Sequence, residues 1–150
     1  MVKQRLSVGL ADLARFEPLV TALGWERMIR ALDDSFQAVG EIVTGQGGRI
    51  VKYLGDAALF TCDDPVRAAR AARAIAGYRG AAGPHTVRFC VAVATGEVWT
   101  ARIGHSSYAV DDIFGDPVNA VFRLLAQARA APDGIALDDE TRAAAGLERR

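Results

Sequence analysis

The most informative part of the sequence is Arg49-Ile-Val-Lys-Tyr-Leu-Gly-Asp-Ala-Ala-Leu-Phe60. Two short apolar runs, at 49–54 and 57–62, flank a Gly-Asp pair, and this pattern predicts a β-hairpin. Lys52 is unusual here, because an ammonium group among apolar neighbours loses hydration unless a partner compensates for it. Asp56 at the tip is common turn chemistry. Together the two charges suggest a functional site.

The composition predicts a single domain over residues 1–150. Of the 150 residues 51% are hydrophobic and 24% are charged, which is typical of a globular chain with a real core. The 18 basic and 18 acidic residues balance, so charge gives no indication of a nucleic-acid surface. No apolar run reaches membrane-spanning length, and charged residues interrupt the N-terminal stretch, which excludes a signal peptide. We therefore expect a cytoplasmic protein with no nucleic-acid or membrane partner.

Periodicity predicts the other elements. They are a strand at 6–10, a helical pattern at 17–43 with a candidate break at Gly24, a helix at 66–78, a loop at 80–84, a strand at 86–95 that passes through a bulge or turn at Gly96-Glu97 into a returning strand at 98–103, a helix at 117–130, a strand at 135–137 and a last helix at 138–146. This order predicts an α+β, ferredoxin-like fold, whose largely antiparallel sheet carries its helices on one face. Cys62 and Cys90 lie in apolar strand-like runs and are expected to be reduced and buried.

Two carboxylates are candidate metal ligands. Asp12 follows the first predicted strand, and Asp56 occupies the hairpin tip. If the fold brings them together, they can bind one or two Mg²⁺ ions, which prefer oxygen ligands. The alternative is that both are ordinary turn residues.

The helix after Pro117 carries a candidate pair for recognition of a sugar and a phosphate. Asn119 and Arg123 are four residues apart, so they are neighbours on the helix surface. Arg offers a planar fork of donors that suits phosphate. The alternative is a capping Asn and a surface Arg.

Lys52 and Asp112 together would match the edge of adenine. A Lys can donate to the ring nitrogen N1, and a carboxylate can accept from the N6 amino group. Guanine presents the opposite polarity at these positions. This inference requires that Lys52 and Asp112 face one pocket.

Three segments, in this order, resemble the class III nucleotidyl cyclases over roughly residues 6–138. GGRIVKYLGDAALF, at 47–60, resembles the lysine-x-x-Gly-Asp hairpin of that family. VAVATGEVWTARIG, at 91–104, resembles the strand pair that follows. DIFGDPVNAVFR, at 112–123, resembles the Asp-Ile-aromatic-Gly-x-x-Val-Asn-x-x-x-Arg segment with matching intervals.

The resemblance implies an adenylyl cyclase that converts ATP to 3′,5′-cyclic AMP and pyrophosphate. It implies two Mg²⁺ or Mn²⁺ ions per site, held by Asp12, Asp56 and the backbone carbonyl of Leu13. It further implies that Lys52 and Asp112 recognise adenine. Of the helix pair, Asn119 would orient the ribose and Arg123 would stabilise charge at the reacting phosphate. The family works as a head-to-tail dimer with shared sites, so a homodimer is expected.

Two departures from the family pattern leave alternatives open. Arg15 and Glu17 replace a Gly and a small hydroxyl residue of the first motif, and nothing after Leu137 resembles the C-terminal hairpin that usually brings a basic residue to the triphosphate. A weakly active or inactive nucleotide-binding or dimerisation module is therefore the alternative. A guanylyl cyclase is disfavoured by the adenine-type pair, and the Gly-Gly-Asp/Glu-Glu-Phe run of diguanylate cyclases is missing.

Overall fold

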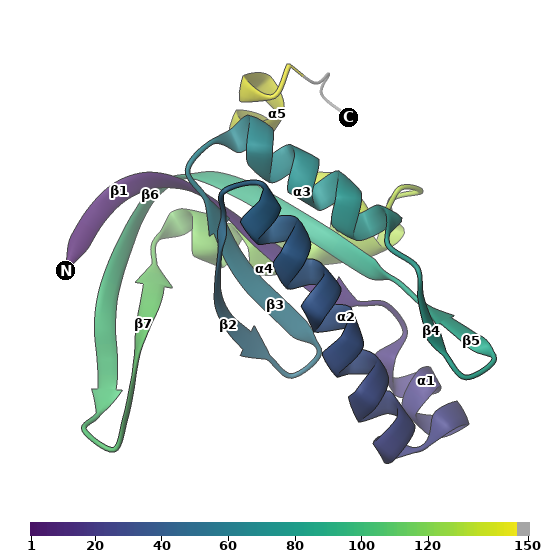
Figure 1. Cartoon of the computed structure of the whole chain (residues 1–150). Helices are drawn as coiled ribbons and strands as arrows, with labels where there is room; N and C mark the ends of the chain where they lie inside the picture. Colours follow the sequence, from purple (N-terminus) through teal and green to yellow (C-terminus); the bar gives the residue numbers. More distant parts are fainter. Residues whose placement is uncertain (147–150) are drawn as a thin grey trace.

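The computed structural model describes residues 1–146, which fold into a curved sheet with helices on both sides (Figure 1). The elements in chain order are β1 (Val2–Leu13), α1 (Phe16–Leu23), α2 (Trp25–Gly45), β2 (Arg49–Leu54), β3 (Ala57–Cys62), α3 (Pro65–Gly77), β4 (Gly80–Ala82), β5 (His85–Val87), β6 (Phe89–His105), β7 (Tyr108–Phe114), α4 (Asp116–Ala130), β8 (Ile135–Leu137) and α5 (Asp139–Ala144).

The main sheet has the strand order β2-β3-β1-β6-β7, and its neighbours along this path are antiparallel. β8 adds to β6 as a parallel strand beside the first half of β6. The four strands β2, β3, β1 and β6, with helices between β1 and β2 and between β3 and β6, form the ferredoxin-like arrangement expected from the sequence. The predicted fold class is confirmed.

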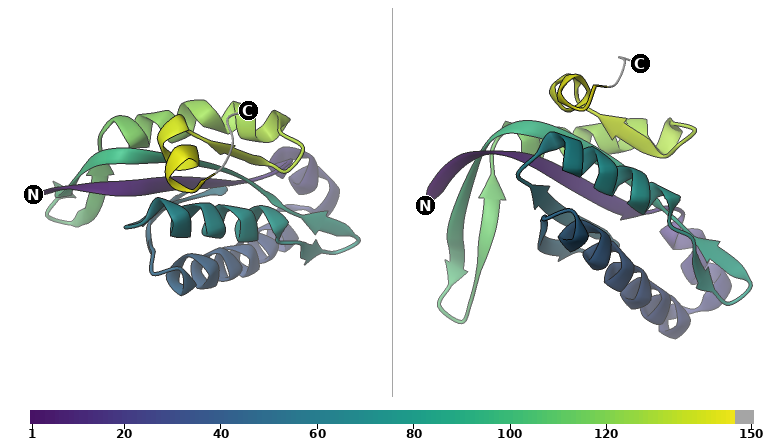
Figure 2. Two further views of the ribbon diagram at one scale, coloured as in Figure 1. Left: turned by 90° about the horizontal axis from the view of Figure 1, so that it is seen from above. Right: turned by 45° about the horizontal axis from the view of Figure 1, so that its top comes forward.

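The helices cover both faces of the sheet, so the expectation that they share one face is wrong for α4. One core cluster packs α2 and α3 against the sheet, through buried residues such as Met28, Val39 and Ile75. The second cluster packs Val121 and Leu125 of α4 against the opposite face. Figure 2 shows α4 and α3 on opposite sides of the strands.

Two predicted connections also differ from the structure. β6 runs without reversal through Gly96 and Glu97, and the chain returns only at β7. The predicted loop at 80–84 is instead part of a small hairpin of β4 and β5. The break at Gly24 is present and separates α1 from α2.

The cysteines are free and buried, as predicted. Burial raises the pKa of the Cys62 thiol to about 11, and the nearby Asp63 carboxylate acts in the same direction, so this thiol is unreactive at neutral pH. No helix among residues 1–146 is long and apolar enough to cross a membrane.

The core tolerates no side chain at Gly9 of β1. An ideal Cβ on Gly9 would lie 2.0 Å from Cζ of Phe60, a fully buried ring on the neighbouring strand. We therefore expect Gly9→Ala to lower the free energy of unfolding by about 1–3 kcal/mol through overpacking. Gly40→Ala on α2 is the matched control, since no atom lies within 4 Å of its added Cβ, and it should stabilise by up to about 1 kcal/mol. Urea denaturation of both variants tests this, and equal midpoints would contradict it.

Candidate active site

The fold brings Asp12 and Asp56 into one cavity. Asp12 is the penultimate residue of β1 and pairs with Ala57 of β3, the residue that follows Asp56. The Leu13 backbone N–H donates to the Asp56 carbonyl, which fixes the hairpin tip against the end of β1. Burial and then the Asp12 charge raise the pKa of the Asp56 carboxyl. The two acids are thus close enough to repel one another.

Arg129, from the last turn of α4, completes this cluster and was not found from the sequence. Its Nη2 donates to Asp12 Oδ2 at 2.7 Å. The Asp12 side chain is 10% exposed, whereas that of Arg129 is 55% exposed. The hydrogen bond to Asp12 raises the pKa of the Arg129 guanidinium. No local pattern could have indicated this contact, since 117 residues separate the two partners.

The cavity around this cluster has a volume of about 380 Å³ and mixed charge. It is lined by Asp12, Leu13, Arg15, Phe16, Glu17, Pro18, Asp56 and Arg129. Arg15 has φ 59°, a left-handed conformation that costs a non-glycine residue about 1 kcal/mol. Both departures from the family's first motif, Arg15 and Glu17, therefore line the cavity of the two acids, where they affect what it binds.

Lys52 and Asp112 face one another. Lys52 Nζ donates to Asp112 Oδ2 at 2.8 Å, so the expected pairing across β2 and β7 is present. A β-bulge at Val51 sets Lys52 opposite Leu59, whose side chain belongs to the core on the α4 side of the sheet. Cross-strand partners share a face, so the bulge turns Lys52 toward that side. The Lys52 side chain is 34% exposed and that of Asp112 is 14% exposed, which leaves the pair accessible to a ligand.

Asn119 and Arg123 lie on the exposed surface of α4. Arg123 lines a separate depression with Thr95, Gly96 and Glu97 of β6, and it does not line the cavity of the two acids. The rise of an α-helix places Arg123 roughly 9 Å along α4 from Arg129, which touches Asp12. Within the described chain, neither Asn119 nor Arg123 makes a side-chain hydrogen bond or ion pair, so both are available to a ligand.

The predicted residues thus form separate groups on one chain. Lys52 lies two strand residues, roughly 7 Å, before the end of β2, whereas Asp56 lies in the turn that follows this strand. Neither Lys52 nor Asp112 lines the cavity of Asp12 and Asp56.

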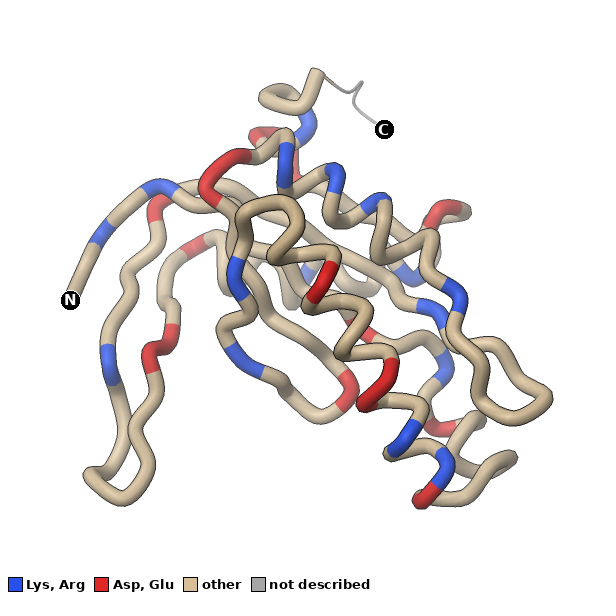
Figure 3. The backbone as a smooth tube through the Cα atoms, in the orientation of Figure 1, with Lys and Arg blue, Asp and Glu red and all other residues tan. Residues whose placement is uncertain are grey.

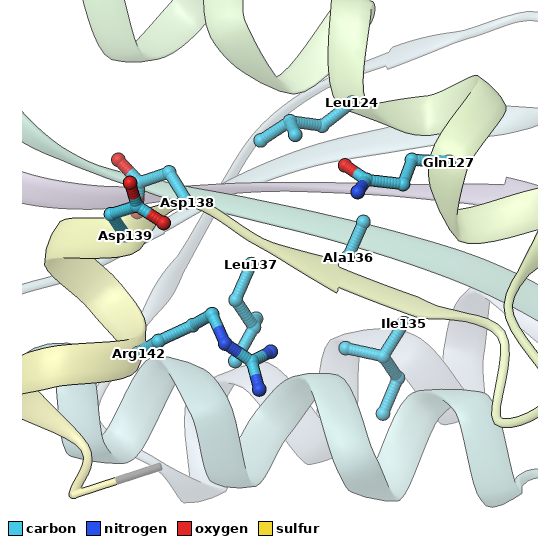
Figure 4. Close-up of a pocket in the computed structure, with 8 residues that line it drawn as sticks. All are labelled: Leu124, Gln127, Ile135, Ala136, Leu137, Asp138, Asp139 and Arg142. Atoms are coloured by element: carbon cyan, nitrogen blue, oxygen red, sulfur yellow. The ribbon is translucent and has the colours of Figure 1, made fainter. Parts of the chain in front are cut away.

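A further cavity, of about 280 Å³, lies between α4, β8 and α5 (Figure 4). It is lined by Leu124, Gln127, Ile135, Ala136, Leu137, Asp138, Asp139 and Arg142, and none of these is a predicted site residue. Asp138 here caps α5 by accepting from the Thr141 N–H. After β8 the described chain continues as α5.

Charges of both signs are distributed along the chain (Figure 3). The charged residues of α3 are all arginines, and Arg67, Arg70 and Arg73 are exposed to solvent.

The donor set at Asp12 and Asp56 fits Mg²⁺ or Mn²⁺. Among residues 1–146 no three His, Cys, Asp or Glu side chains converge on one point, which excludes a cage made only of protein side chains there. Mg²⁺ is usually held by one or two carboxylates together with water and substrate phosphates. Asp12, Asp56 and the Leu13 carbonyl would hold the ions, and Arg129 would compete with them for Asp12.

Comparison with known proteins identifies the fold. An uncharacterized protein of Mycobacterium tuberculosis is 34% identical over 128 residues, which cover 85% of this chain and 31% of that protein. An adenylate cyclase of Streptomyces coelicolor is 34% identical over 125 residues, which cover 83% of this chain and 30% of the cyclase. The chain thus spans less than a third of the curated relatives it matches. No protein-family model matches the chain.

Solved structures of cyclases superpose on most of the chain. The crystal structure of the guanylyl cyclase Cya2 matches with a TM-score of 0.80 and 21% identity, over 97% of this chain and 80% of that chain. The resemblance inferred from the sequence is therefore confirmed at the level of the fold: the chain has the fold of a class III nucleotidyl cyclase catalytic domain.

Proposed function

We propose that the chain is an adenylyl cyclase domain, which converts ATP to 3′,5′-cyclic AMP and pyrophosphate at sites shared by two copies. The observation that carries the proposal is the cavity that holds Asp12 and Asp56 together, in a fold shared with nucleotidyl cyclases. The adenylate cyclase of Streptomyces coelicolor, 34% identical, supports the same activity.

Adenine is the base that the Lys52–Asp112 pair supports. The two side chains satisfy one another at 2.8 Å, so a base that displaces this contact must offer an acceptor to Lys52 and a donor to Asp112. Adenine offers both, at N1 and N6. With guanine, the donor Lys52 would face a donor of the base and the acceptor Asp112 would face an acceptor. Neither side chain would be hydrogen-bonded, and each polar group left unpaired lowers the binding affinity.

A second copy of the chain would complete each site. Arg123 and the Lys52–Asp112 pair lie outside the cavity of the two acids, and exposed apolar side chains flank them. These are Leu54 beside the hairpin tip, Phe114 beside Asp112 and Phe122 beside Arg123. Exposed apolar groups around a polar site favour coverage by a partner, and a two-fold axis presents the same patch on both copies.

The reaction forms a bond between the ribose 3′-oxygen and the α-phosphorus and breaks the bond from the α-phosphorus to the oxygen of pyrophosphate. The 3′-hydroxyl proton passes to solvent water. The cations at Asp12 and Asp56, when bound, would lower the pKa of the 3′-hydroxyl and neutralise charge on the phosphates. Asn119 would orient the ribose, and Arg123 would donate to the phosphate oxygens as charge builds there. Lys52 and Asp112 would fix the base, so that much of the catalysis is positioning.

A nucleotide-binding module with little turnover is the second candidate. Arg129 on Asp12 and Glu17 in the cavity favour it, because both oppose entry of the cation or the triphosphate.

An assay with ATP and GTP separates the candidates. Purified protein with Mn²⁺-ATP should produce cyclic AMP, and GTP at the same concentration should be converted at least about tenfold more slowly. Product is identified by mass spectrometry. Binding of ATP without cyclic AMP would support the module, and faster turnover of GTP would contradict the adenine assignment.

A further inference from the structure

Arg129 has no role in the proposed reaction, although it lies at the candidate cation site. Its guanidinium is hydrogen-bonded to Asp12, one of the two carboxylates that would bind the cations. An arginine and a divalent ion compete for this carboxylate, because both bond its oxygens and their positive charges repel one another at such short range. Binding of the ion at Asp12 therefore favours release of Arg129.

The released side chain stays within reach of the cavity. α4 is fixed at this end by the buried neighbour Ala128 and by Leu125 one turn earlier, so the backbone of Arg129 does not need to move. The side chain itself is more than half exposed and can change rotamer. Arg129 lines the same cavity as Asp56 and Arg15, so its guanidinium can reach the space that a phosphate chain would fill.

The charge of the cavity changes sign when cations bind. Three carboxylates and two guanidinium groups line it in the described chain, which leaves a net negative charge that repels phosphate. Two divalent ions would make it positive. A guanidinium without a carboxylate partner then finds its strongest acceptor in a phosphate oxygen, to which Arg donates in a bidentate manner.

We propose that Arg129 is a phosphate-binding residue of this site, held on Asp12 until a divalent cation displaces it and then bound to the triphosphate of the substrate. The inference rests on the proposed function. It gives the cavity of the two acids a basic residue from α4.

Two binding measurements on the full chain test the role of Arg129 without any need for turnover. Mn²⁺ alone is titrated by electron paramagnetic resonance, and inorganic triphosphate with saturating Mg²⁺ is titrated by calorimetry. Arg129→Ala should weaken triphosphate binding about tenfold or more, which is the loss of a charge-assisted hydrogen bond. The same variant should bind Mn²⁺ alone as tightly as the wild type or more tightly. Arg129→Lys should retain part of the triphosphate affinity, and Arg73→Ala, an exposed arginine of α3, is the matched control.

The outcomes separate this inference from the proposed function. Equal triphosphate affinity in wild type and Arg129→Ala would overturn the inference and leave the cyclase proposal intact. Loss of Mn²⁺ and triphosphate binding to the same extent would also overturn it, because it would assign Arg129 a structural role only. A wild-type protein that binds neither Mn²⁺ nor triphosphate would overturn the inference together with the proposed function.

Discussion

Asp56→Asn is expected to abolish cyclic AMP formation while the protein stays folded. The amide is nearly isosteric with the carboxylate but carries no charge, so one of the two side-chain ligands for the cations is lost. Metal ions contribute several kcal/mol to transition-state stabilisation, and each 1.4 kcal/mol is about tenfold in rate, so we expect a loss of about a thousandfold or more. The rate of cyclic AMP formation from Mn²⁺-ATP is the measurement.

The same variant should gain stability in the absence of metal. Burial and the Asp12 charge raise the pKa of Asp56 in the folded chain above its ordinary value, so folding favours the protonated, neutral form. The Asp56 carboxylate therefore destabilises the fold once the pH exceeds its ordinary pKa, and the neutral amide removes this penalty. In EDTA at pH 7 the melting temperature of Asp56→Asn should equal or exceed that of the wild type.

Added Mn²⁺ should reverse the order of stability. It should raise the melting temperature of the wild type, because a ligand that binds only the folded state stabilises it, and should raise that of Asp56→Asn much less. Asp33→Asn, at an exposed position of α2, is the matched control and should change neither activity nor the response to Mn²⁺. A fully active Asp56→Asn enzyme would remove Asp56 from the site.

Local chemistry made the central hairpin predictable from the sequence. β2 and β3 occupy 49–54 and 57–62, as expected, because a Gly-Asp turn between apolar runs specifies its own register. The rule that glycine between apolar runs marks a turn gave a wrong prediction at Gly96. A Cβ at this position would lie 3.0 Å from Pro117 of α4, so the glycine makes room for helix packing while the strand continues through it.

Long-range geometry was not predictable in the same way. The apolar stripe of α4 indicates which side of the helix is buried, but not which face of the sheet it covers. β1 presents Val8 to one core cluster and Ala11 to the other, so its pattern suits helices on either face. The Asp12–Arg129 contact joins residues that no periodicity relates, whereas Lys52 and Asp112 could be paired in advance through the chemistry of adenine.

The second large effect concerns sites shared between two copies. Lys52→Ala and Asp56→Ala should each be nearly inactive as a homodimer, the first through loss of base recognition and the second through loss of a cation ligand. If the cation ligands of a site come from one copy and Lys52 from the other, a mixed dimer has one intact site and one site with both defects. Half of the dimers in an equal mixture are mixed, so activity should recover to about a quarter of the wild-type value.

Sharing of sites between two copies is therefore tested best by the rate of cyclic AMP formation in an equimolar mixture of these two variants, with mixed dimers verified by native mass spectrometry. Shared sites predict recovery to about a quarter of the wild-type rate, far above either variant alone. Mixed dimers that remain as inactive as the separate variants would contradict it, because Lys52 and Asp56 would then serve the same site of one chain.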